Sequence, residues 1–587
     1  MDRSYAKDKE NTLRGTDLRK KAERSIFPAL LFVWPFAGIR EGVDLGDSLY
    51  ALTNYRFLSG SGSTWDMATF LSNRVGEGIL HLPGAETLLG YKIYCTLLIS
   101  LLAVLSYFVL KRFMPGWIAF TGEWIAVSLA WCPTVILYNT LTYFLLTLAC
   151  LLLFLGVSSV PEKGSFFVLA GVCLGLNVFV RFSNLTQAAL ILPVWFHTAV
   201  TLQKSTRLLP RTLQCVGGYL GGLLAGAAVL LAEGHLSAYL RMIRDLFTMT
   251  ETAGDYSLSG MLFSTGSAYL HSLRWFLILL ACTLFGAIAF SLPLFRKMRR
   301  GRKVLFVLGT VLLFVFFERR GMYTLNYRDY WSMFEWGMVF LILAVLLCAA
   351  GMTTVWKGNA EERFLACLTL VLILILPFGS NNYTFPVLND LFIIAPVTLW
   401  LLRRMLLRMS GGKGIDAFRL MGMAVVLMLL LQGSLFHLQY SFRDGTDGSA
   451  RSETVESFLR IRGIRTTKDN QAVLSELQEI RAQIPKEERE TKALVAVGNT
   501  PGVHYLLDME PALSNAWPDL NSYPKEALQK DLQSISEEFL YIERKTDPED
   551  PGAMRAEKKD VLSDYLTQNG YRTVYDGTYW KMMRTDG

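Results

Sequence analysis

The sequence predicts an all-α polytopic membrane domain of about thirteen transmembrane helices followed by a small extracytoplasmic α/β domain. Three observations support this fold class. Of the 587 residues, 52% are hydrophobic and only 18% are charged, and the mean hydropathy is +0.32, which is too apolar for a soluble globular protein of this size. Apolar runs recur from residue 26 to residue 436, separated by linkers that are alternately basic. The composition then changes after His437.

Each apolar run is a candidate spanning helix, which needs roughly 20 mostly apolar residues. The polar and basic residues 1–25 precede the first run, and no small-residue cleavage site follows that run. This pattern predicts a retained first helix and not a signal peptide. The runs are centred near residues 33, 101, 126, 147, 173, 192, 222, 280, 310, 343, 370, 396 and 427.

The distribution of Lys and Arg predicts how the chain is oriented. Basic residues gather on the cytoplasmic side of membrane proteins, so we expect a multi-pass protein of the plasma membrane with a cytoplasmic N-terminus. An odd number of spans then places residues 437–587 outside the cytoplasm, and 41–90 becomes a long first outer loop. The basic linkers are the N-terminus, 111–113, 161–163, 203–211, 296–303, 356–363 and 403–413.

The C-terminal segment predicts a separate extracytoplasmic α/β domain over residues 437–587. It carries 20 Lys and Arg against 26 Asp and Glu, a net charge of −6, while the preceding residues carry +14. This balance argues against a nucleic-acid partner. Strands are expected in ALVAVGN (493–499), FLYIER (539–544) and YRTVYDGTYWKMM (571–583), with helical stretches at SETVESFLRIRG (452–463), PKEALQKDLQSI (524–535) and KKDVLSDYLTQNG (558–570).

A cluster of carboxylates lies at the start of the first outer loop. Glu41, Asp44 and Asp47 fall within seven positions, and on a helix this spacing places them on one stripe. Carboxylates beside a membrane are costly and need solvent, a cation or a function. The stripe could bind a divalent cation such as Mg²⁺ or Mn²⁺, or position a general base. An ordinary solvated turn with acids near a helix N-terminus explains the same residues equally well.

The motif Asp47-Ser48-Leu49-Tyr50-Ala51, running into Asn54-Tyr55-Arg56, resembles the GT-C class of membrane glycosyltransferases. The long first outer loop and the domain after the last span are similar to that class too. The resemblance implies a sugar donor carried on polyprenyl phosphate and a catalytic acid in the first outer loop, acting as base or through a metal. Asp47 matches this role best and Asp44 is second, with Glu41 and Tyr50 as substrate-binding neighbours.

The sequence departs from several subfamilies of that class. Its C-terminal tail lacks the WWD-type motif expected in the tail of oligosaccharyltransferases. Its first outer loop lacks the Asp-Glu pair of protein mannosyltransferases. The acceptor therefore stays open between a cell-envelope glycan, a lipid and a protein.

An inverting displacement of polyprenyl phosphate needs a base near the acceptor hydroxyl and positive charge near the departing phosphate. Arginine suits the phosphate because its planar guanidinium donates hydrogen bonds in pairs. Residues of this kind can instead contact lipid headgroups, lie in ordinary solvated loops or cap loops. The candidate substrate-binding residues on the outer face are Arg181, Arg241, Arg244, Arg319, Arg320, Tyr327, Arg328, Asn381 and Asn382.

Two other classes of protein compete with this interpretation. A transporter or lipid flippase without covalent chemistry usually keeps ionisable residues at its span centres. Charges are nearly absent there, and the exception, Glu123 of the third span, lies near the end expected at the cytoplasm. A receptor-like protein that binds an envelope polymer is the second alternative. The receptor-like protein predicts that replacing Asp47 leaves the function intact.

Overall fold

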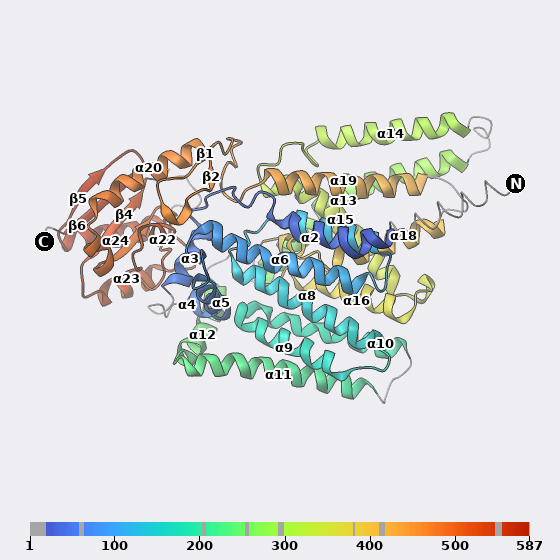
Figure 1. The fold of residues 1–587 in the computed structure, drawn as a ribbon, viewed down its shortest axis with the longest axis horizontal. Coiled ribbons are helices and arrows are strands. Elements are labelled where there is room, and N and C mark those ends of the chain that lie inside the picture. The colour runs from blue at the N-terminus through green and yellow to red at the C-terminus, as the bar shows by residue number, and fades with distance from the viewer. Residues whose placement is uncertain are drawn as a thin grey trace.

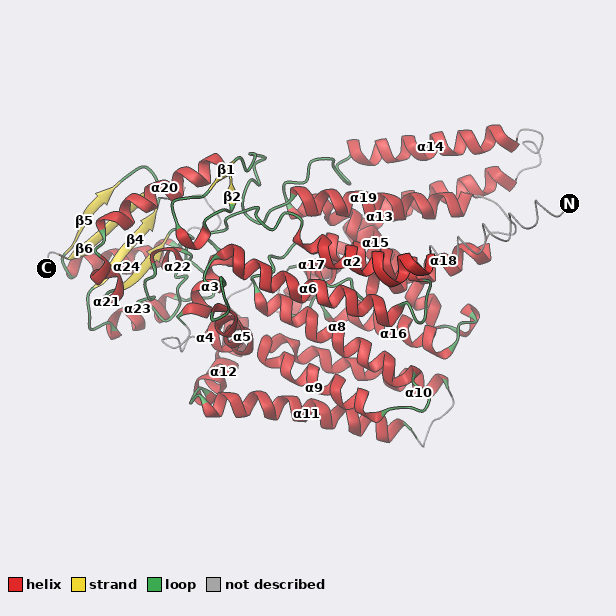
Figure 2. Cartoon of the chain, in the orientation of Figure 1, coloured by secondary structure: helices red, strands yellow, loops and turns green. Residues whose placement is uncertain are grey.

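The computed structural model describes residues 19–57, 64–201, 207–252, 258–291, 299–379, 382–409, 417–545 and 554–585. A bundle of long helices makes up most of the molecule, and a smaller domain lies against one end of it (Figure 1). The strands are confined to that smaller domain (Figure 2). The predicted class, a helical membrane domain followed by a small C-terminal domain with a β-sheet, is confirmed.

Each of the thirteen predicted centres lies within a helix. Six described helices are long and apolar enough to cross a membrane by length and composition: 88–110, 137–158, 208–232, 259–289, 330–352 and 417–439. The helices at the predicted centres are α2 Phe27–Val33, α6 Leu88–Leu110, α7 Gly116–Leu129, α8 Leu137–Ser158, α9 Gly164–Val180, α10 Ile191–Val200, α11 Leu208–Ala232, α13 Leu258–Ser291, α14 Arg299–Arg319, α15 Phe334–Met352, α16 Ala360–Ile375, α18 Ile394–Met409 and α19 Ala417–Gln439.

The first span is more irregular than a single helix of about 20 residues. A π-helical turn, Ala22–Ile26, precedes α2, and a 3₁₀ turn, Trp34–Phe36, follows it. Pro35 lies in that last turn, and the chain becomes extended at Ala37, because proline cannot donate the backbone hydrogen bond that would continue the helix.

Helices α9 and α11 pack backbone against backbone through glycines. A methyl group at Gly171 or Gly218 would collide with the backbone of the facing helix, and one at Gly222 would lie 2.5 Å from the carbonyl oxygen of Val172. Small residues four apart permit this close approach between membrane helices. The neighbouring Gly217 and Gly221 face open space instead.

The first outer loop folds into three helices: α3 Asp47–Arg56, α4 Thr64–Ala68 and α5 Phe70–Leu80. Tyr55 connects this loop to the bundle, because its hydroxyl donates to the carbonyl of Val135 and accepts from the N–H of Leu137, both at 3.0 Å. Its ring packs over Gly76 of α5, where a side chain carbon would lie 2.5 Å from the ring. The C-terminal end of α3 is thereby held against the bundle.

Further short helices join the spans, namely α12 Leu236–Thr252, α17 Phe385–Asn389 and the 3₁₀ turns Phe182–Leu190, Tyr330–Met333 and Thr354–Trp356. In the C-terminal domain the structure contains β1 Glu453–Thr454, a 3₁₀ turn Leu459–Ile461, β2 Arg465–Thr466, α20 Lys468–Gln483, α21 Lys486–Thr491, β3 Ala493–Val497, α22 Val503–Leu507, α23 Lys525–Ser534, β4 Phe539–Arg544, α24 Ala556–Gln568, β5 Tyr571–Asp576 and β6 Trp580–Thr585.

The main sheet of the C-terminal domain has the strand order β3-β4-β6-β5. β3 and β4 are parallel, with Leu494 opposite Leu540, whereas β6 is antiparallel to both β4 and β5. Helices α22 and α23 lie in the chain between the two parallel strands, as a parallel crossover requires. The predicted strands and the two later helices are present. The stretch 452–463 is instead a short strand and a 3₁₀ turn, and Gly463 has a left-handed backbone conformation (φ 78°).

The two faces of this sheet belong to different cores. Alternate residues of a strand point to opposite faces, so Val495 and Tyr541 pack with α23 and α24. Leu494 and Ile542 face the other way and share a core with Leu49 of the first outer loop. Hereafter we call residues 437–587 the outer domain. Its sheet and the first outer loop are therefore packed as one unit.

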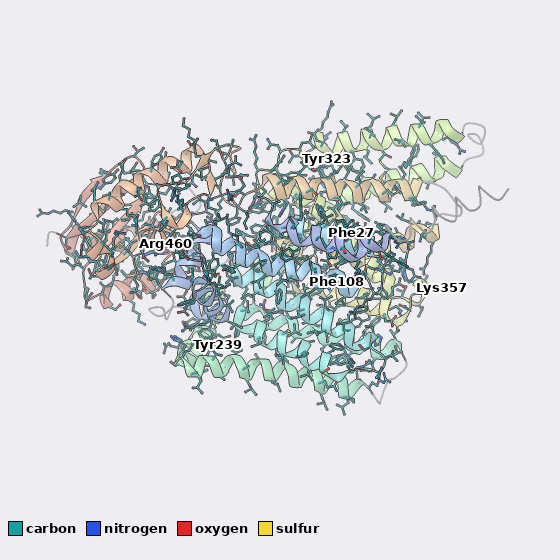
Figure 3. All side chains as sticks on the ribbon, viewed as in Figure 1. Phe27, Phe108, Tyr239, Tyr323, Lys357 and Arg460 are labelled. Carbon is teal, nitrogen blue, oxygen red and sulfur yellow. The ribbon has the colours of Figure 1, made fainter. Side chains whose placement is uncertain are left out.

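The basic linkers that the structure describes lie away from this unit. Lys357 is found at the end of the bundle away from the outer domain, and Arg460 lies at the opposite end with the outer domain (Figure 3). At the Lys357 end, Glu162 binds Arg207 at 2.6 Å and Arg211 at 2.7 Å. Lys357, from a linker predicted to be basic, thus lies at the end of the bundle opposite the outer domain.

Candidate active site

Asp44 caps helix α3. One of its carboxylate oxygens accepts from the N–H of Gly46 at 2.9 Å and the other from the N–H of Ser48 at 2.7 Å, which satisfies donors that the start of a helix leaves free. Burial raises the pKa of Asp44 from 3.8 to about 6, and the neighbouring Asp47 carboxylate contributes to the rise. Asp44 is thus positioned beside the site and committed to the helix start.

Asp47, the first residue of α3, forms an ion pair with Arg443. The Arg443 Nη2 atom lies 3.0 Å from Asp47 Oδ2, and 29% of the Asp47 side chain is exposed. Burial of the site raises the pKa of Asp47, and the charge of Arg443 opposes this rise. The guanidinium therefore favours the ionised carboxylate, which is the form that can accept a proton.

Arg443 is held in an unusual conformation. Its φ of 54° lies in the left-handed region, which is disfavoured for a residue with a side chain and is concentrated at functional sites. The guanidinium lies 5.3 Å from the ring centre of Phe442 and 5.7 Å from that of Trp517. A side chain carbon at Gly46 would lie 2.5 Å from Arg443 Nη1. A side chain at this position would therefore require the guanidinium to shift from its place beside Asp47.

Asp47 opens into a cavity of about 350 Å³, which we call the main cavity. Asp47, Tyr50 and Asn54 line it from one face of α3, as residues spaced three and four apart on a helix do. Parts of the chain far apart in sequence complete the walls. The lining residues outside α3 include Ala68, Asn73, Tyr138, Arg181, Phe182, Ser183, Leu246, Met261, Gly379, Trp517, Leu520 and Ser522.

Arg181 is the predicted arginine that the fold brings to the main cavity. It follows the last residue of α9, and its Nη2 donates to the carbonyl of Gly379 at 2.9 Å. Its guanidinium lies 5.5 Å from the ring centre of Tyr138. The cavity therefore contains a carboxylate, a cation from another helix and apolar side chains, a combination suited to an amphipathic anion.

Other predicted residues lie outside the lining of the main cavity. Glu41 binds Arg451 at 2.9 Å and Arg465 at 3.0 Å, so it ties the first outer loop to the outer domain. The Tyr327 side chain is buried against Phe436 and donates its hydroxyl to Gln432. Both residues hold the packing of the fold.

The remaining predicted arginines and amides are exposed. Arg241 and Arg244 lie on the exposed face of α12, and Arg319 and Arg320 are exposed at the end of α14. We expected these arginines in outer loops, which suggested an accessible site. In the structure their side chains are exposed on the surface. Arg328 is exposed and donates to the carbonyl of Asp447, Asn382 is exposed in a turn, and Asn381 lies outside the described residues.

The sequence analysis missed Arg443 and Trp517. Arg443 comes four residues after the end of α19, and a cation that directly follows the last span was a signal of the same kind as Arg181. Trp517 carried no such signal, because it lies in the outer domain and reaches the main cavity only through tertiary packing.

The carboxylates do not match the donor set of a divalent-cation site. Mg²⁺ and Mn²⁺ prefer several free oxygen ligands, yet both Asp44 oxygens accept N–H groups and Asp47 binds Arg443. Among the residues that the structure describes, no group of three His, Cys, Asp or Glu is placed to hold a metal ion. We derive no step through a metal.

No protein-family model matches this chain, and no curated protein matches it. A solved structure shares the fold of this chain, which is the GT-C fold that the resemblance of the first outer loop implied. The particular structure is ArnT from Cupriavidus metallidurans bound to undecaprenyl phosphate, with a TM-score of 0.50 and 12% identity over 96% of this chain and 98% of that one. The same protein in its apo state has a TM-score of 0.36 and 13% identity, over 94% and 96%.

Proposed function

We propose that this chain is a membrane glycosyltransferase that transfers a sugar from a polyprenyl-phosphate donor to an acceptor outside the cytoplasm. The shared fold supports the class, and the ArnT structure of the same fold is bound to undecaprenyl phosphate. The acceptor would be a hydroxyl of a cell-envelope glycan, a lipid or a protein.

The observation that carries this proposal is the composition of the main cavity. Asp47, which is paired with Arg443, and Arg181 line the same space as Met261, Leu246 and other apolar side chains. A polyprenyl phosphate has an anionic head and an apolar chain, so it needs positive charge and apolar walls in one site. The main cavity offers both beside a carboxylate.

The reaction would be a single displacement with inversion at the anomeric carbon. The acceptor oxygen bonds to that carbon while the bond to the phosphate oxygen breaks, and the electron pair leaves with the polyprenyl phosphate. Asp47 takes the acceptor proton as general base. Arg181 stabilises the negative charge that develops on the phosphate, and Arg443 keeps Asp47 ionised before the proton arrives.

We also propose that the N-terminus is cytoplasmic and that the main cavity faces the outside of a plasma membrane. The positive-inside rule supports this orientation, because Lys357 of the basic linker 356–363 lies at the end of the bundle opposite the outer domain (Figure 3). Donor and acceptor would then both reach Asp47 from the outer leaflet.

The test is the release of polyprenyl phosphate by the purified chain in nanodiscs, with a panel of polyprenyl-phosphate sugars and envelope extract as acceptor. We expect turnover of at least one donor, and we expect Asp47→Asn to reduce it by about 10²-fold or more, since positioned proton transfer contributes that much. Arg320→Gln is the control, because Arg320 is exposed and lies outside the main cavity lining.

A transporter predicts a different result. Glu123 of α7 is buried, and neither of its carboxylate oxygens has a hydrogen-bond partner among the described residues, a state typical of functional groups inside membranes. Movement of labelled lipid without release of polyprenyl phosphate, sensitive to Glu123→Gln and indifferent to Asp47→Asn, would replace the glycosyltransferase with a transporter.

A further inference from the structure

One wall of the main cavity comes from the outer domain. Trp517, Leu520 and Ser522 line the cavity together with Asp47 and Tyr50 of α3. These three residues belong to the segment 513–523, which lies between α22 and α23 and which we call the 513–523 loop. The outer domain thus helps to form the site itself.

Trp517 lies beside the reacting groups. Its ring meets the Tyr50 ring edge to face, with centres 5.4 Å apart, and the Arg443 guanidinium lies 5.7 Å from its centre. Since Arg443 binds Asp47 at 3.0 Å, the indole is one residue away from the proposed base. A sugar whose anomeric carbon is next to Asp47 must lie near this ring.

Asn515 connects the loop to α3 and leaves polar capacity unused. Its Oδ1 atom accepts from the Tyr50 hydroxyl at 3.1 Å and from the backbone N–H of Trp517 at 2.8 Å. The Asn515 Nδ2 and Trp517 Nε1 atoms are buried without a hydrogen-bond partner among the residues that the structure describes. Unpaired buried donors are costly, and hydroxyl oxygens of a sugar are the acceptors that would satisfy them.

A buried lysine fixes the shape of the loop. Lys558 of α24 is 2% exposed, and its ammonium donates at 2.7, 2.8 and 3.1 Å to three backbone carbonyls of the loop, those of Pro518, Leu520 and Tyr523. The Oδ1 atom of Asp519 also accepts a hydrogen bond from the backbone N–H of Gly498 at 3.1 Å. The loop is therefore a preorganised surface, as specific binding favours.

We propose that the outer domain supplies the sugar subsite of the main cavity, with Trp517 as the platform on which the donor sugar stacks and Lys558 as the residue that positions it. This inference rests on the proposed function and adds which part of the chain reads the sugar. Arg181 and the apolar walls would hold the phosphate and the lipid, while the 513–523 loop would contact the pyranose or furanose ring.

The experiment compares two ligands in nanodiscs without acceptor: the sugar donor that the wild-type chain turns over, and the corresponding polyprenyl phosphate without sugar. We expect Trp517→Ala to weaken binding of the sugar donor about tenfold, the scale of one aromatic contact, and to change binding of the bare polyprenyl phosphate less than twofold. Trp517→Phe should restore most of the loss. Lys558→Met should weaken the sugar donor selectively too.

Trp117→Ala is the matched control, because Trp117 is an exposed tryptophan of α7 and lies outside the main cavity lining. If Trp517→Ala weakens binding of the sugar donor and of the bare polyprenyl phosphate equally, the inference is overturned and the proposed function stands. Unchanged binding of the sugar donor would have the same meaning. If the wild-type chain binds and turns over no donor, the inference falls together with the proposed function.

Discussion

The Asp47–Arg443 ion pair is the residue-scale feature on which the proposed chemistry depends. Arg443→Met would leave Asp47 without its cation, so its pKa would rise further. We expect turnover to fall by about 10²-fold, the usual cost of removing one preorganised charge from an active site. The same measurement on Arg320→Met should give wild-type turnover, and an Arg443→Met chain as active as that control would remove Arg443 from the site.

The pH dependence of turnover provides a second residue-scale test. Burial raises the pKa of Asp44 to about 6 and raises that of Asp47 as well. A general base works when ionised, and the pKa of Asp47 is raised, so we expect turnover to fall with decreasing pH already above the ordinary carboxyl value of 3.8. The two carboxylates titrate as a coupled pair.

Asp44→Asn removes one negative charge, and we therefore expect the acidic limb to move to lower pH. The amide oxygen can keep one of the two hydrogen bonds at the start of α3. A pH–rate profile of both chains measures the shift, and an unchanged limb would contradict the coupling.

The raised pKa of Asp44 also lowers the free energy of unfolding as pH rises from 3.8 to about 6, because the folded state retains a proton that the unfolded state has released.

At this scale the sequence predicted only part of the site. Asp47 and Arg181 were identifiable because charge beside an apolar run is costly and needs a reason. The capping role of Asp44 depends on where α3 begins, and the role of Arg443 depends on a left-handed backbone next to Gly46. Neither feature can be derived from residue type and spacing.

At the scale of elements, the glycine contact between α9 and α11 makes a direct prediction. Gly222→Leu would push the helices apart, because even one added carbon would lie 2.5 Å from the carbonyl oxygen of Val172. We expect this change to lower the melting temperature in nanodiscs by several degrees, since overpacking costs about 1–3 kcal/mol.

Gly221→Leu is the matched control, one position away on the same helix, where nothing lies within 4 Å of the added carbon. Both variants carry the same change in helix propensity and hydrophobicity. Equal melting temperatures for the two would show that the close approach of α9 and α11 is unimportant for stability.

Helix positions were the most predictable elements, because an apolar run of spanning length leaves the backbone few alternatives in a membrane. The helices inside the first outer loop were not predicted. They are short, and α3 buries Leu49 and Tyr55 against partners from elsewhere in the chain, so their own sequence carries little of the signal.

At the scale of the whole molecule, the outer domain and the first outer loop should lose structure together. Gly502 lies where α22 meets α3: its N–H donates to the carbonyl of Leu45 at 2.9 Å, and an added carbon would collide with Leu49. We expect Gly502→Leu to separate the two and to expose residues 64–90 to protease, as measured by mass spectrometry of the fragments.

Ser536→Leu is the control for this change, because Ser536 is an exposed residue of the same domain. New cleavage confined to the outer domain of Gly502→Leu, with the first outer loop still protected, would contradict the single shared core. The sequence indicated two domains because composition changes at residue 437, and composition alone does not reveal that a later domain packs on an early loop.

The long separation between these packed segments has a consequence for synthesis. The N–H of Val43 binds the Asp444 carboxylate across 401 positions of the chain. At the usual 5–20 residues per second, the ribosome needs about 20–80 s to make that stretch. Until then α3 lacks its final partners. The nascent chain must therefore pass through a membrane-inserted state in which the proposed active site is incomplete. Translation of the outer domain would then be the event that completes the proposed active site.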